Sequence, residues 1–400
     1  MKARPGGSRR RFQGDRAMEF GFTVEQETMR NLLRDSLDEV CTDAYLRRCD
    51  EEHRYPKEVF ELLAELGFYG LAFPVLQGGT GGSAIDMLIV AEELGRKSYD
   101  LAAAYALTVF NGLNLLKIGT EEQKRHYIPL VISGQIKFSI SITEPDAGSD
   151  VAAIRTTARL EGDRFVINGQ KVFSSAADQP GNVINLVCRT LKGSTRHEGL
   201  SLILVDPHTP GVEIRRLKTL GRWMLGTNEI FFTDAEVPAD RLVGPLHQGW
   251  QALMGCLRLE RAFAAAAYCG NAQTVVDEAL QYARDRQQFG RSIGDFQSIA
   301  HMLADMQTEV DMVRLLCYRA AWMVEQGVEC TREVSMAKLA GSETFARVAN
   351  MGMQIMGGYG YMMDFNMQRY FRDARICTVT AGTSQIQRNI IARTMGLRPK

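Results

Sequence analysis

The spacing of apolar residues changes twice along this 400-residue chain, and these changes constrain the fold more than any other feature. Over residues 23–134 apolar side chains recur every three or four positions, which is the period of amphipathic helices. Over residues 137–244 the period is two, which is typical of short strands separated by turns. Helical spacing returns from residue 249 to the end. The pattern predicts an α+β protein in which a small β-domain, consistent with a barrel, separates two helical regions.

The predicted division is an N-terminal extension at 1–17, an N-terminal helical domain at 18–137, a middle β-domain at 138–246 and a C-terminal helical domain at 247–400. Expected helices include Ile85 to Leu94, a buried apolar stretch at 102–118, and 249–283, 295–326, 332–356 and 384–395. Expected strands include 154–160, 164–167, 183–188, 200–205 and 229–232, with turns at Gly162-Asp163 and Asn168-Gly169.

The charge balance and the cysteines exclude several classes of protein. Lys plus Arg and Asp plus Glu both total 47, so no strong field favours nucleic acid as a partner. The eight cysteines include no C-x-x-C pair and the six histidines do not cluster. We therefore expect free thiols in a reducing, cytoplasmic compartment, and no metal. No apolar run approaches the ~20 residues of a membrane span.

The Arg-rich first 17 residues contain one large apolar side chain, Phe12. They therefore lack the amphipathic face of a transit peptide, and we expect a disordered extension ahead of a natural start at Met18.

Residues 142–150 (Ile-Thr-Glu-Pro-Asp-Ala-Gly-Ser-Asp) form a polar turn after an apolar strand. Gly148 allows the backbone to approach a ligand closely, and Thr143 and Ser149 offer hydroxyl groups. The pattern alone fits both an ordinary strand-to-loop turn and a binding loop.

Glu260 is the strongest candidate for a catalytic residue. On the expected helix it shares its face with Leu253 and Ala264, so its carboxylate lies on an apolar stripe. Desolvation raises the pKa of a carboxyl group toward the range of a general base. A structural ion pair with Arg258 or Arg261 is the alternative.

Two further clusters combine groups suited to binding. Arg286, Phe289 and Gln297 gather at an expected interhelical turn, where they can hold a phosphate-bearing cofactor, or cap helices and fill the core. The segment from Gln354 to Gly358 fits either a site where a ligand approaches the backbone closely or an ordinary helix C-cap.

The last expected helix starts with Ser384 to Gln387, a capping-box pattern that leaves free N–H groups just after Thr383.

Taken in order, these segments resemble the acyl-CoA dehydrogenase family from about Met18 to the C-terminus. Residues 143–150 resemble its flavin loop T-E-P-G-A-G-S-D, with Asp146 in place of the usual glycine. Residues 168–175 resemble the strand that packs on the flavin ring, and residues 382–387 resemble the G-T-x-Q-x-Q segment near the C-terminus.

The resemblance implies FAD as cofactor, bound between a helical domain, a β-barrel domain and a C-terminal four-helix bundle, usually in a homotetramer. Its FAD positions match Ile140, Thr143, Ser149, Phe173, Ser175, Arg286, Phe289, Gln297, Gln354, Gly358, Thr383 and Gln385. Of these, the stretches from Arg286 to Gly290, Gln297 and Gln354 to Gly358 resemble those that a neighbouring subunit lends to the FAD. Its substrate positions match Ser149, Arg261, Ala381, Gly382 and Arg393.

The implied reaction is α,β-dehydrogenation of an acyl-CoA, with electrons passing to an electron-transfer flavoprotein. A carboxylate removes the α proton, hydride leaves the β carbon for flavin N5, and the Ala381 N–H binds the thioester carbonyl. Many members place the carboxylate where this chain has Ala381. Leu259-Glu260-Arg261 instead fits the branch similar to isovaleryl- and long-chain enzymes, which assigns the base to Glu260 and makes short straight chains less expected as substrates.

Other positions leave alternatives open. Residues 49–56 resemble bacterial relatives that include crotonobetainyl-CoA reductase, so an enoyl-CoA reductase is one alternative. A flavin monooxygenase or oxidase, or a non-catalytic binding subunit on the same fold, is another. Residues 222–227 depart from the family's R-G-S-x-T segment, so contacts near the thioester are expected to differ. Arg258 stands where Asp is frequent; it fits either an acidic or oxygenated acyl group or a surface position.

Overall fold

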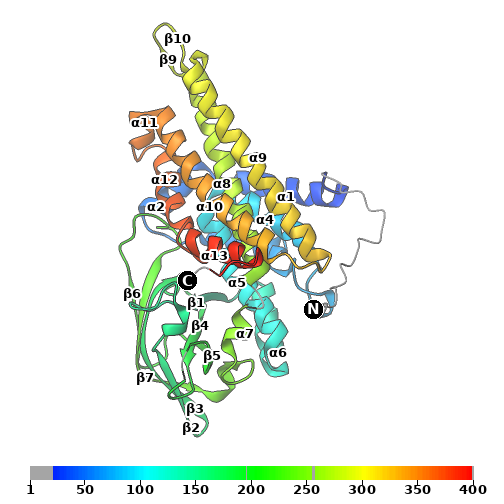
Figure 1. The fold of residues 1–400 in the computed structure, drawn as a ribbon, viewed down its shortest axis with the longest axis vertical. Helices are drawn as coiled ribbons and strands as arrows, with labels where there is room; N and C mark the ends of the chain where they lie inside the picture. Colours follow the sequence, from blue (N-terminus) through cyan, green and yellow to red (C-terminus); the bar gives the residue numbers. More distant parts are fainter. Residues whose placement is uncertain (1–20, 195, 255–256, 399–400) are drawn as a thin grey trace, which may run out of the picture.

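The computed structural model describes residues 21–194, 196–254 and 257–398, and the side chains of all of these except 254, 257 and 258. The β-sheet domain occupies one end of the molecule, and a bundle of long helices extends from it to the opposite end (Figure 1). The predicted extension at 1–17, Cys256 and the side chain of Arg258 lie outside the described residues.

The N-terminal region is helical, as its periodicity predicts. It consists of α1 (Val24–Val40), α2 (Asp43–Glu51), α3 (Lys57–Glu65), η1 (Phe68–Gly70), η2 (Val75–Gln77), α4 (Ala84–Lys97), α5 (Tyr99–Ile118) and α6 (Glu121–Ile132). Reciprocal capping boxes begin three of these helices, with Thr23, Ser83 and Thr120 as N-caps.

Helix α5 corrects one expectation from the sequence. Over its 20 residues it is long and apolar enough to cross a membrane by length and composition, although no such run was expected. Within the protein 61% of its apolar window is buried, and a core helix passes the same test. Its composition is explained by burial, because α5 packs against α4, α6, α8 and β1.

The middle region forms one eight-stranded sheet. Its strands are β1 (Lys137–Ser141), β2 (Thr157–Glu161), β3 (Arg164–Ser175), β4 (Asn182–Arg189), β5 (Leu200–Val205), β6 (Val212–Arg216), β7 (Thr227–Pro238) and β8 (Leu242–Val243), and the short helices η3 (Val151–Ala153) and η4 (Ala239–Arg241) connect them. The order is β6-β7-β3-β2-β4-β5-β8, and β1 pairs in parallel with β4.

The two predicted turns in this region have different outcomes. Gly162, at φ +61°, closes the β2–β3 hairpin as predicted. The turn predicted at Asn168-Gly169 is wrong, because β3 continues through it with a register shift against β7 between Ile167 and Gly169. Gly169 has φ +145°, and a Cβ there would lie 2.5 Å from Thr156 Oγ1, so glycine permits a bulge rather than a reversal.

The C-terminal region consists of α7 (Gly249–Met254), α8 (Leu257–Asp285), β9 (Gln287–Gln288), β10 (Arg291–Ser292), η5 (Ile293–Asp295), α9 (Gln297–Glu325), α10 (Thr331–Met356), α11 (Gly358–Tyr361), α12 (Met367–Cys377) and α13 (Ser384–Thr394). Helix α12 was not predicted. Helix α13 begins at Ser384, as predicted, but its N-cap is Thr383, whose Oγ1 accepts from Ile386 N–H, and not Ser384 as the capping-box pattern suggested.

The N-terminal and C-terminal helices share one hydrophobic core, and the sheet has a second core of its own. Helices α4 and α8 pack closely at two glycines: a Cβ at Gly95 would lie 2.2 Å from Ala267 O, and one at Gly270 would lie 2.1 Å from Glu92 O. This contact fixes the helix that carries Glu260 against the N-terminal region. Among the described cysteines, Cys41, Cys49, Cys188, Cys269, Cys317 and Cys377 are free and buried, as the scattered spacing predicts.

Candidate active site

Glu260 lines a small cavity where the two helical regions meet the sheet domain. The other lining residues come from α5, β1 and α7: Ala106, Leu107, Phe110, Asn111, Asn114, Ile140 and Leu253. The space open to the centre of a water molecule is about 20 Å³, enough for roughly one water. The structure thus places two predicted site residues, Glu260 and Ile140, at one cavity.

The surroundings of Glu260 change its acidity in the predicted direction. Burial raises its pKa from 4.5 to about 6, and the positive charge of Arg261 opposes this shift. In the part of the chain that the structure describes, no ion pair within 4.0 Å joins these two side chains. A partly desolvated carboxyl with this pKa is suited to accept a proton near neutral pH.

The loop between α12 and α13 holds the backbone at Ala381 in an unusual conformation. Ala381 has φ +54°, which is uncommon for a residue other than glycine. The carbonyl oxygens of Ala381 and Gly382 accept hydrogen bonds from Gln387 Nε2 at 3.2 and 3.1 Å. Lys338 Nζ donates to Gly382 O at 2.8 Å and to Cys377 O at 3.0 Å. Two buried side chains therefore fix the segment whose N–H is predicted to bind the thioester.

The other side chains near this loop that are predicted to contact the cofactor or the substrate are exposed or half-buried. Gln385 and Arg393 on α13 are exposed, and Arg261 is half-buried. Burial lowers the pKa of Arg261, while the negative charge of Glu260 raises it. The three side chains can therefore be reached by a ligand from solvent.

The loop at 143–150 is braced from inside by a buried ion pair. Glu144 accepts hydrogen bonds from Arg155 N–H and Thr156 N–H at 2.6 and 2.8 Å, and from Lys171 Nζ at 2.8 Å. Lys171 also donates to Ile142 O at 2.8 Å. Because this bracing occupies Glu144, the ends of the loop are fixed and its Gly148-Ser149 tip is exposed.

Next to this loop, Phe173 on β3 is presented to solvent by strained backbone. Its φ is +62° and its side chain is 63% exposed. The register of β3 against β7 shifts between Lys171 and Ser174, and Ser175 resumes the pairing. An exposed aromatic ring at a positive φ is a feature that binding sites retain at a cost in stability.

The other predicted cofactor residues lie at the opposite end of the molecule. The β9–β10 hairpin projects beyond the helices, far from the sheet (Figure 1). Phe289 at its tip is 93% exposed, and Gln297, Gln354 and Gly358 are exposed nearby on α9, α10 and α11. The guanidinium of Arg286 lies 5.5 Å from the ring centre of Tyr359, which ties the hairpin to α11. Within one chain, the predicted cofactor residues therefore lie in two groups at different places in the fold.

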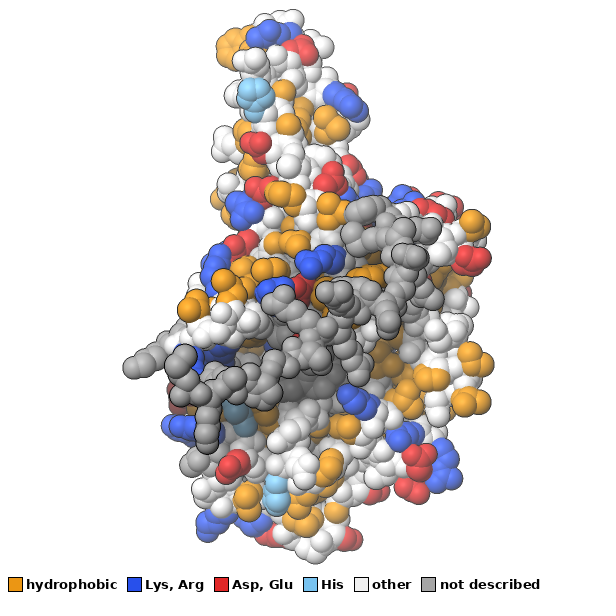
Figure 2. Space-filling model, turned by 45° about the vertical axis from the view of Figure 1, so that its right-hand side comes forward, with side chains coloured by type: hydrophobic (Ala, Val, Ile, Leu, Met, Phe, Trp, Pro, Cys, Tyr) orange, Lys and Arg blue, Asp and Glu red, His pale blue; other side chains and the backbone are white. Residues whose placement is uncertain are grey.

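The surface of this projecting end carries apolar and charged side chains side by side (Figure 2). Exposed apolar residues of this end include Phe289 of the hairpin, Tyr361 of α11 and Met362, which follows α11.

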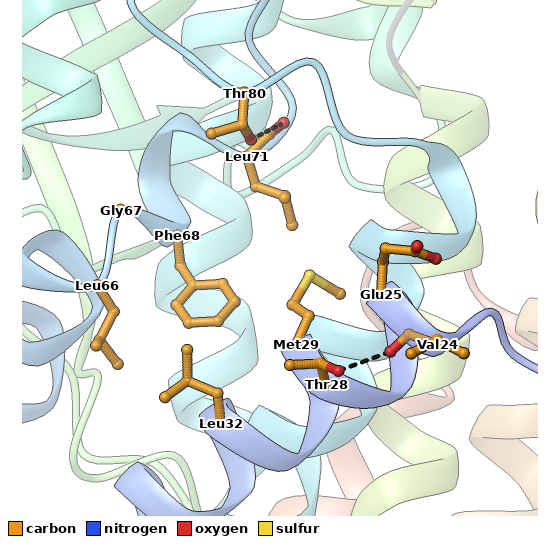
Figure 3. Close-up of a pocket in the computed structure, with 10 residues that line it drawn as sticks. All are labelled: Val24, Glu25, Thr28, Met29, Leu32, Leu66, Gly67, Phe68, Leu71 and Thr80. Carbon is orange, nitrogen blue, oxygen red and sulfur yellow. Dashed lines mark hydrogen bonds between the residues drawn. The ribbon is translucent and has the colours of Figure 1, made fainter.

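A second, larger cavity of about 420 Å³ lies between α1 and η1. Apolar side chains from both elements, among them Met29, Leu32, Phe68 and Leu71, face one another across it (Figure 3). None of its lining residues also lines the Glu260 cavity.

Comparison with known proteins agrees with this geometry. The sequence matches the models of the acyl-CoA dehydrogenase N-terminal domain over residues 23–135, middle domain over 139–235 and C-terminal domain over 247–396. The caffeyl-CoA reductase–Etf complex subunit CarC of Acetobacterium woodii is 35% identical over 93% of this chain and 98% of its own.

Two solved structures have the same fold. The glutaryl-coenzyme A dehydrogenase glutaryl-CoA complex has a TM-score of 0.90 and 33% identity, covering 95% of this chain and 98% of the other. The FAD complex of PigA has a TM-score of 0.89 and 26% identity, covering 96% and 100%. The chain belongs to the acyl-CoA dehydrogenase family, whose members are flavin-linked oxidoreductases that act on CH–CH bonds.

Several residues of the site were missed by the sequence analysis. Asn111 and Asn114 line the Glu260 cavity from a helix that the sequence marked only as apolar and buried. Two asparagines three positions apart in such a helix were the available signal, because Asn is disfavoured in helices and in cores. Lys338 gave no local signal, since its partner Gly382 lies 44 residues away. Gln387 belongs to the 382–387 segment noted in the sequence, but its bond to Gly382 O was not predicted.

Proposed function

We propose that the protein carries out FAD-dependent α,β-dehydrogenation of an acyl-CoA thioester, with Glu260 as the base that removes the α proton. The observation that carries the proposal is the desolvated Glu260 carboxyl in a cavity that Ile140 of β1 also lines. Bound FAD would supply the hydride acceptor for the β carbon.

The residues around the loop fit a flavin. The tip at Gly148 is open, since a Cβ there would meet nothing within 4 Å, and Ser149 and Thr143 offer hydroxyl and backbone groups. The exposed ring of Phe173 offers an apolar surface for a planar group. The FAD complex of PigA shows that a protein of this fold holds the cofactor.

The thioester would be activated at the α13 end of the site. The Ala381 N–H would donate to the thioester carbonyl and stabilise the negative charge that develops when the α proton leaves. Its left-handed conformation and the bonds from Gln387 and Lys338 to the following carbonyl groups support this role. Arg261 and Arg393 would interact with the CoA portion.

The separation of the two groups of cofactor residues supports a shared FAD site. The β9–β10 hairpin, with the exposed Phe289 at its tip, lies at the end of the molecule opposite the sheet (Figure 1), so we infer that it cannot reach a cofactor held at the 143–150 loop of its own chain. A second copy of the chain would bring its projecting end to that loop. We therefore propose a homo-oligomer, with a tetramer as the expected form.

The electron partner in this proposal is an electron-transfer flavoprotein. The relative CarC is named as a subunit of an Etf complex. The same relative is a caffeyl-CoA reductase, which favours enoyl-CoA reduction as the second candidate function. In that direction Glu260 would deliver the proton to the α carbon.

An anaerobic titration of the flavin-loaded protein with acyl-CoA thioesters, followed by flavin absorbance, tests the proposal. Straight, branched, aromatic and dicarboxylic chains form the panel. We expect bleaching by at least one class, slowed by ~10³-fold or more in Glu260→Gln, because the base is lost. Reoxidation of the reduced protein by an enoyl-CoA, without bleaching by any saturated thioester, would favour the reductase.

Glu278→Gln is the matched control. Glu278 lies on the same helix, and burial raises its pKa also, but it bonds Tyr370 and does not line the cavity. The flavin of this variant is expected to be bleached by the acyl-CoA as it is in the parent protein. Equal loss in both variants, or protein that binds no flavin, would contradict the proposal.

A further inference from the structure

The wall of the Glu260 cavity contains two carboxamides in an otherwise apolar helix. Asn111 and Asn114 are 9% and 4% exposed, and both line the cavity from α5. Asparagine is unfavourable in a helix interior, and burial of an amide adds to that cost unless it is hydrogen-bonded. Because both side chains line the cavity, a group that enters it meets amides on an otherwise apolar helix.

The hydrogen bonds of Asn111 determine what it still offers. Its Oδ1 accepts from Asn185 Nδ2 on β4 at 2.6 Å, and its Nδ2 donates to Leu107 O at 2.7 Å. A carboxamide nitrogen carries two hydrogens, so one N–H remains. The bond from Asn185 fixes the orientation of the amide, and the group left for a ligand is a donor.

The charges around the cavity restrict further which hydrogen-bond acceptor a ligand can place there. Glu260 supplies a carboxyl group, and the described lining residues include no Lys, Arg or His. A carboxylate on the ligand would therefore lie beside a like charge without a counter-ion, which is costly in a desolvated site. A neutral oxygen, as in a hydroxyl or keto group, accepts the hydrogen bond without that cost.

From these contacts we infer that the cavity beside Glu260 receives a neutral hydrogen-bonding oxygen of the acyl group, with Asn111 and Asn114 as specificity-determining residues. The inference rests on the proposed function, because it assigns the cavity beside Glu260 to the acyl group.

The test compares three CoA thioesters whose acyl chains share three methylene groups and end in methyl (pentanoyl), hydroxyl (hydroxybutanoyl) or carboxylate (glutaryl). The flavin-loaded protein is mixed anaerobically with each thioester, and the second-order rate constant of flavin reduction is measured by stopped-flow absorbance. The hydroxyl chain is expected to exceed the methyl chain by about tenfold or more, which is the discrimination of one hydrogen bond, and the carboxylate to be poorest. A methyl chain as good as the hydroxyl chain, or glutaryl as the best substrate, overturns the inference.

Variants assign the preference to the two amides. Asn111→Leu combined with Asn185→Leu removes both partners of one bond, so that no amide is left unpaired, and Asn114→Leu is made separately in case the double variant does not fold. In each variant the rate constant for the hydroxyl chain, divided by that for the methyl chain, is expected to be close to one. Thr108→Val is the control, since Thr108 is buried on α5 but does not line the cavity, and its ratio should match the parent.

The outcomes separate the two proposals. Reduction by pentanoyl-CoA with no preference for hydroxyl leaves the proposed function standing and overturns the inference. A preference that persists in folded, flavin-bound Asn114→Leu and in the double variant also overturns it. A flavin that no acyl-CoA thioester reduces, and no enoyl-CoA reoxidises, removes the proposed function itself.

Discussion

At the scale of single residues, the acidity of Glu260 predicts how the reaction depends on pH. Burial raises its pKa to about 6, and only the ionised form accepts a proton. The rate constant of flavin reduction by a saturated thioester should therefore rise with pH through about pH 6 and level off above ~7. Stopped-flow absorbance over that range measures it. A rate that is constant across this range would show that another group is the base.

The same raised pKa predicts that ionised Glu260 lowers the free energy of unfolding. Its folded-state pKa lies above the ordinary 4.5, so the folded protein binds more protons than the unfolded chain between these values. Stability is therefore lost as pH rises from about 4.5 to about 6. At pH 7 Glu260→Gln should raise the free energy of unfolding by roughly 1–2 kcal/mol, since one pKa unit is about 1.4 kcal/mol.

Thermal denaturation of the parent and the Glu260→Gln variant measures this stabilisation as a difference in Tm. The gain should be present near pH 7 and shrink toward pH 4, where both states of the parent protein are protonated. Glu61→Gln is the control, because Glu61 is exposed beside Lys57 and should change Tm little. A gain that is the same at both pH values would point to packing rather than charge.

At the scale of elements, the buried pair under the 143–150 loop is predicted to determine both stability and flavin binding. Lys171→Met removes the cation and leaves the Glu144 carboxylate buried, which costs about 3–5 kcal/mol when a buried pair is broken. Chemical denaturation and FAD content measure the two effects. Adding Glu144→Gln to Lys171→Met should recover part of the stability.

The exposed pair on the same loop is the control. Arg155 and Asp146 lie 3.9 Å apart and are both 81% exposed. Arg155→Ala should therefore cost less than about 1 kcal/mol. Similar losses for the buried and the exposed pair would show that the bracing is unimportant.

How far the elements could be predicted depended on the range of the interactions. Helices α1, α4 and α5 follow from local periodicity, and the hairpin at Gly162 follows from turn chemistry. Asn168-Gly169 reads as a turn locally, but pairing of β3 with β7 carries the strand through it as a bulge. The bracing role of Glu144 was also invisible, because its partner Lys171 is 27 residues away.

At the scale of the whole molecule, the sequence predicted two groups of cofactor residues but could not place them relative to each other. Glu260 was identifiable because desolvation follows from its own helix face. The cavity opposite it was not, because Asn111 and Ile140 approach Glu260 only in the folded tertiary structure. The separation of Phe289 from the 143–150 loop likewise appears only in three dimensions (Figure 1).

That separation predicts complementation between two defective chains. One chain carries Ser149→Lys in the loop, and the other carries Arg286→Ala with Phe289→Ala in the hairpin, so that neither alone completes a flavin site. In a mixed two-fold dimer one of the two sites combines the intact loop of one chain with the intact hairpin of the other. Random reassembly makes about half of the dimers mixed, so about a quarter of the sites should recover flavin.

Co-expression with two affinity tags, followed by FAD absorbance of the purified mixture, measures this recovery. A chain that carries both defects, co-expressed with itself, is the control and should bind none. If each chain completed its own site, every site in the mixture would keep one defect and no flavin would return. Recovery would therefore show that loop and hairpin meet across two copies, as the separation of the β9–β10 hairpin from the sheet within one chain predicts.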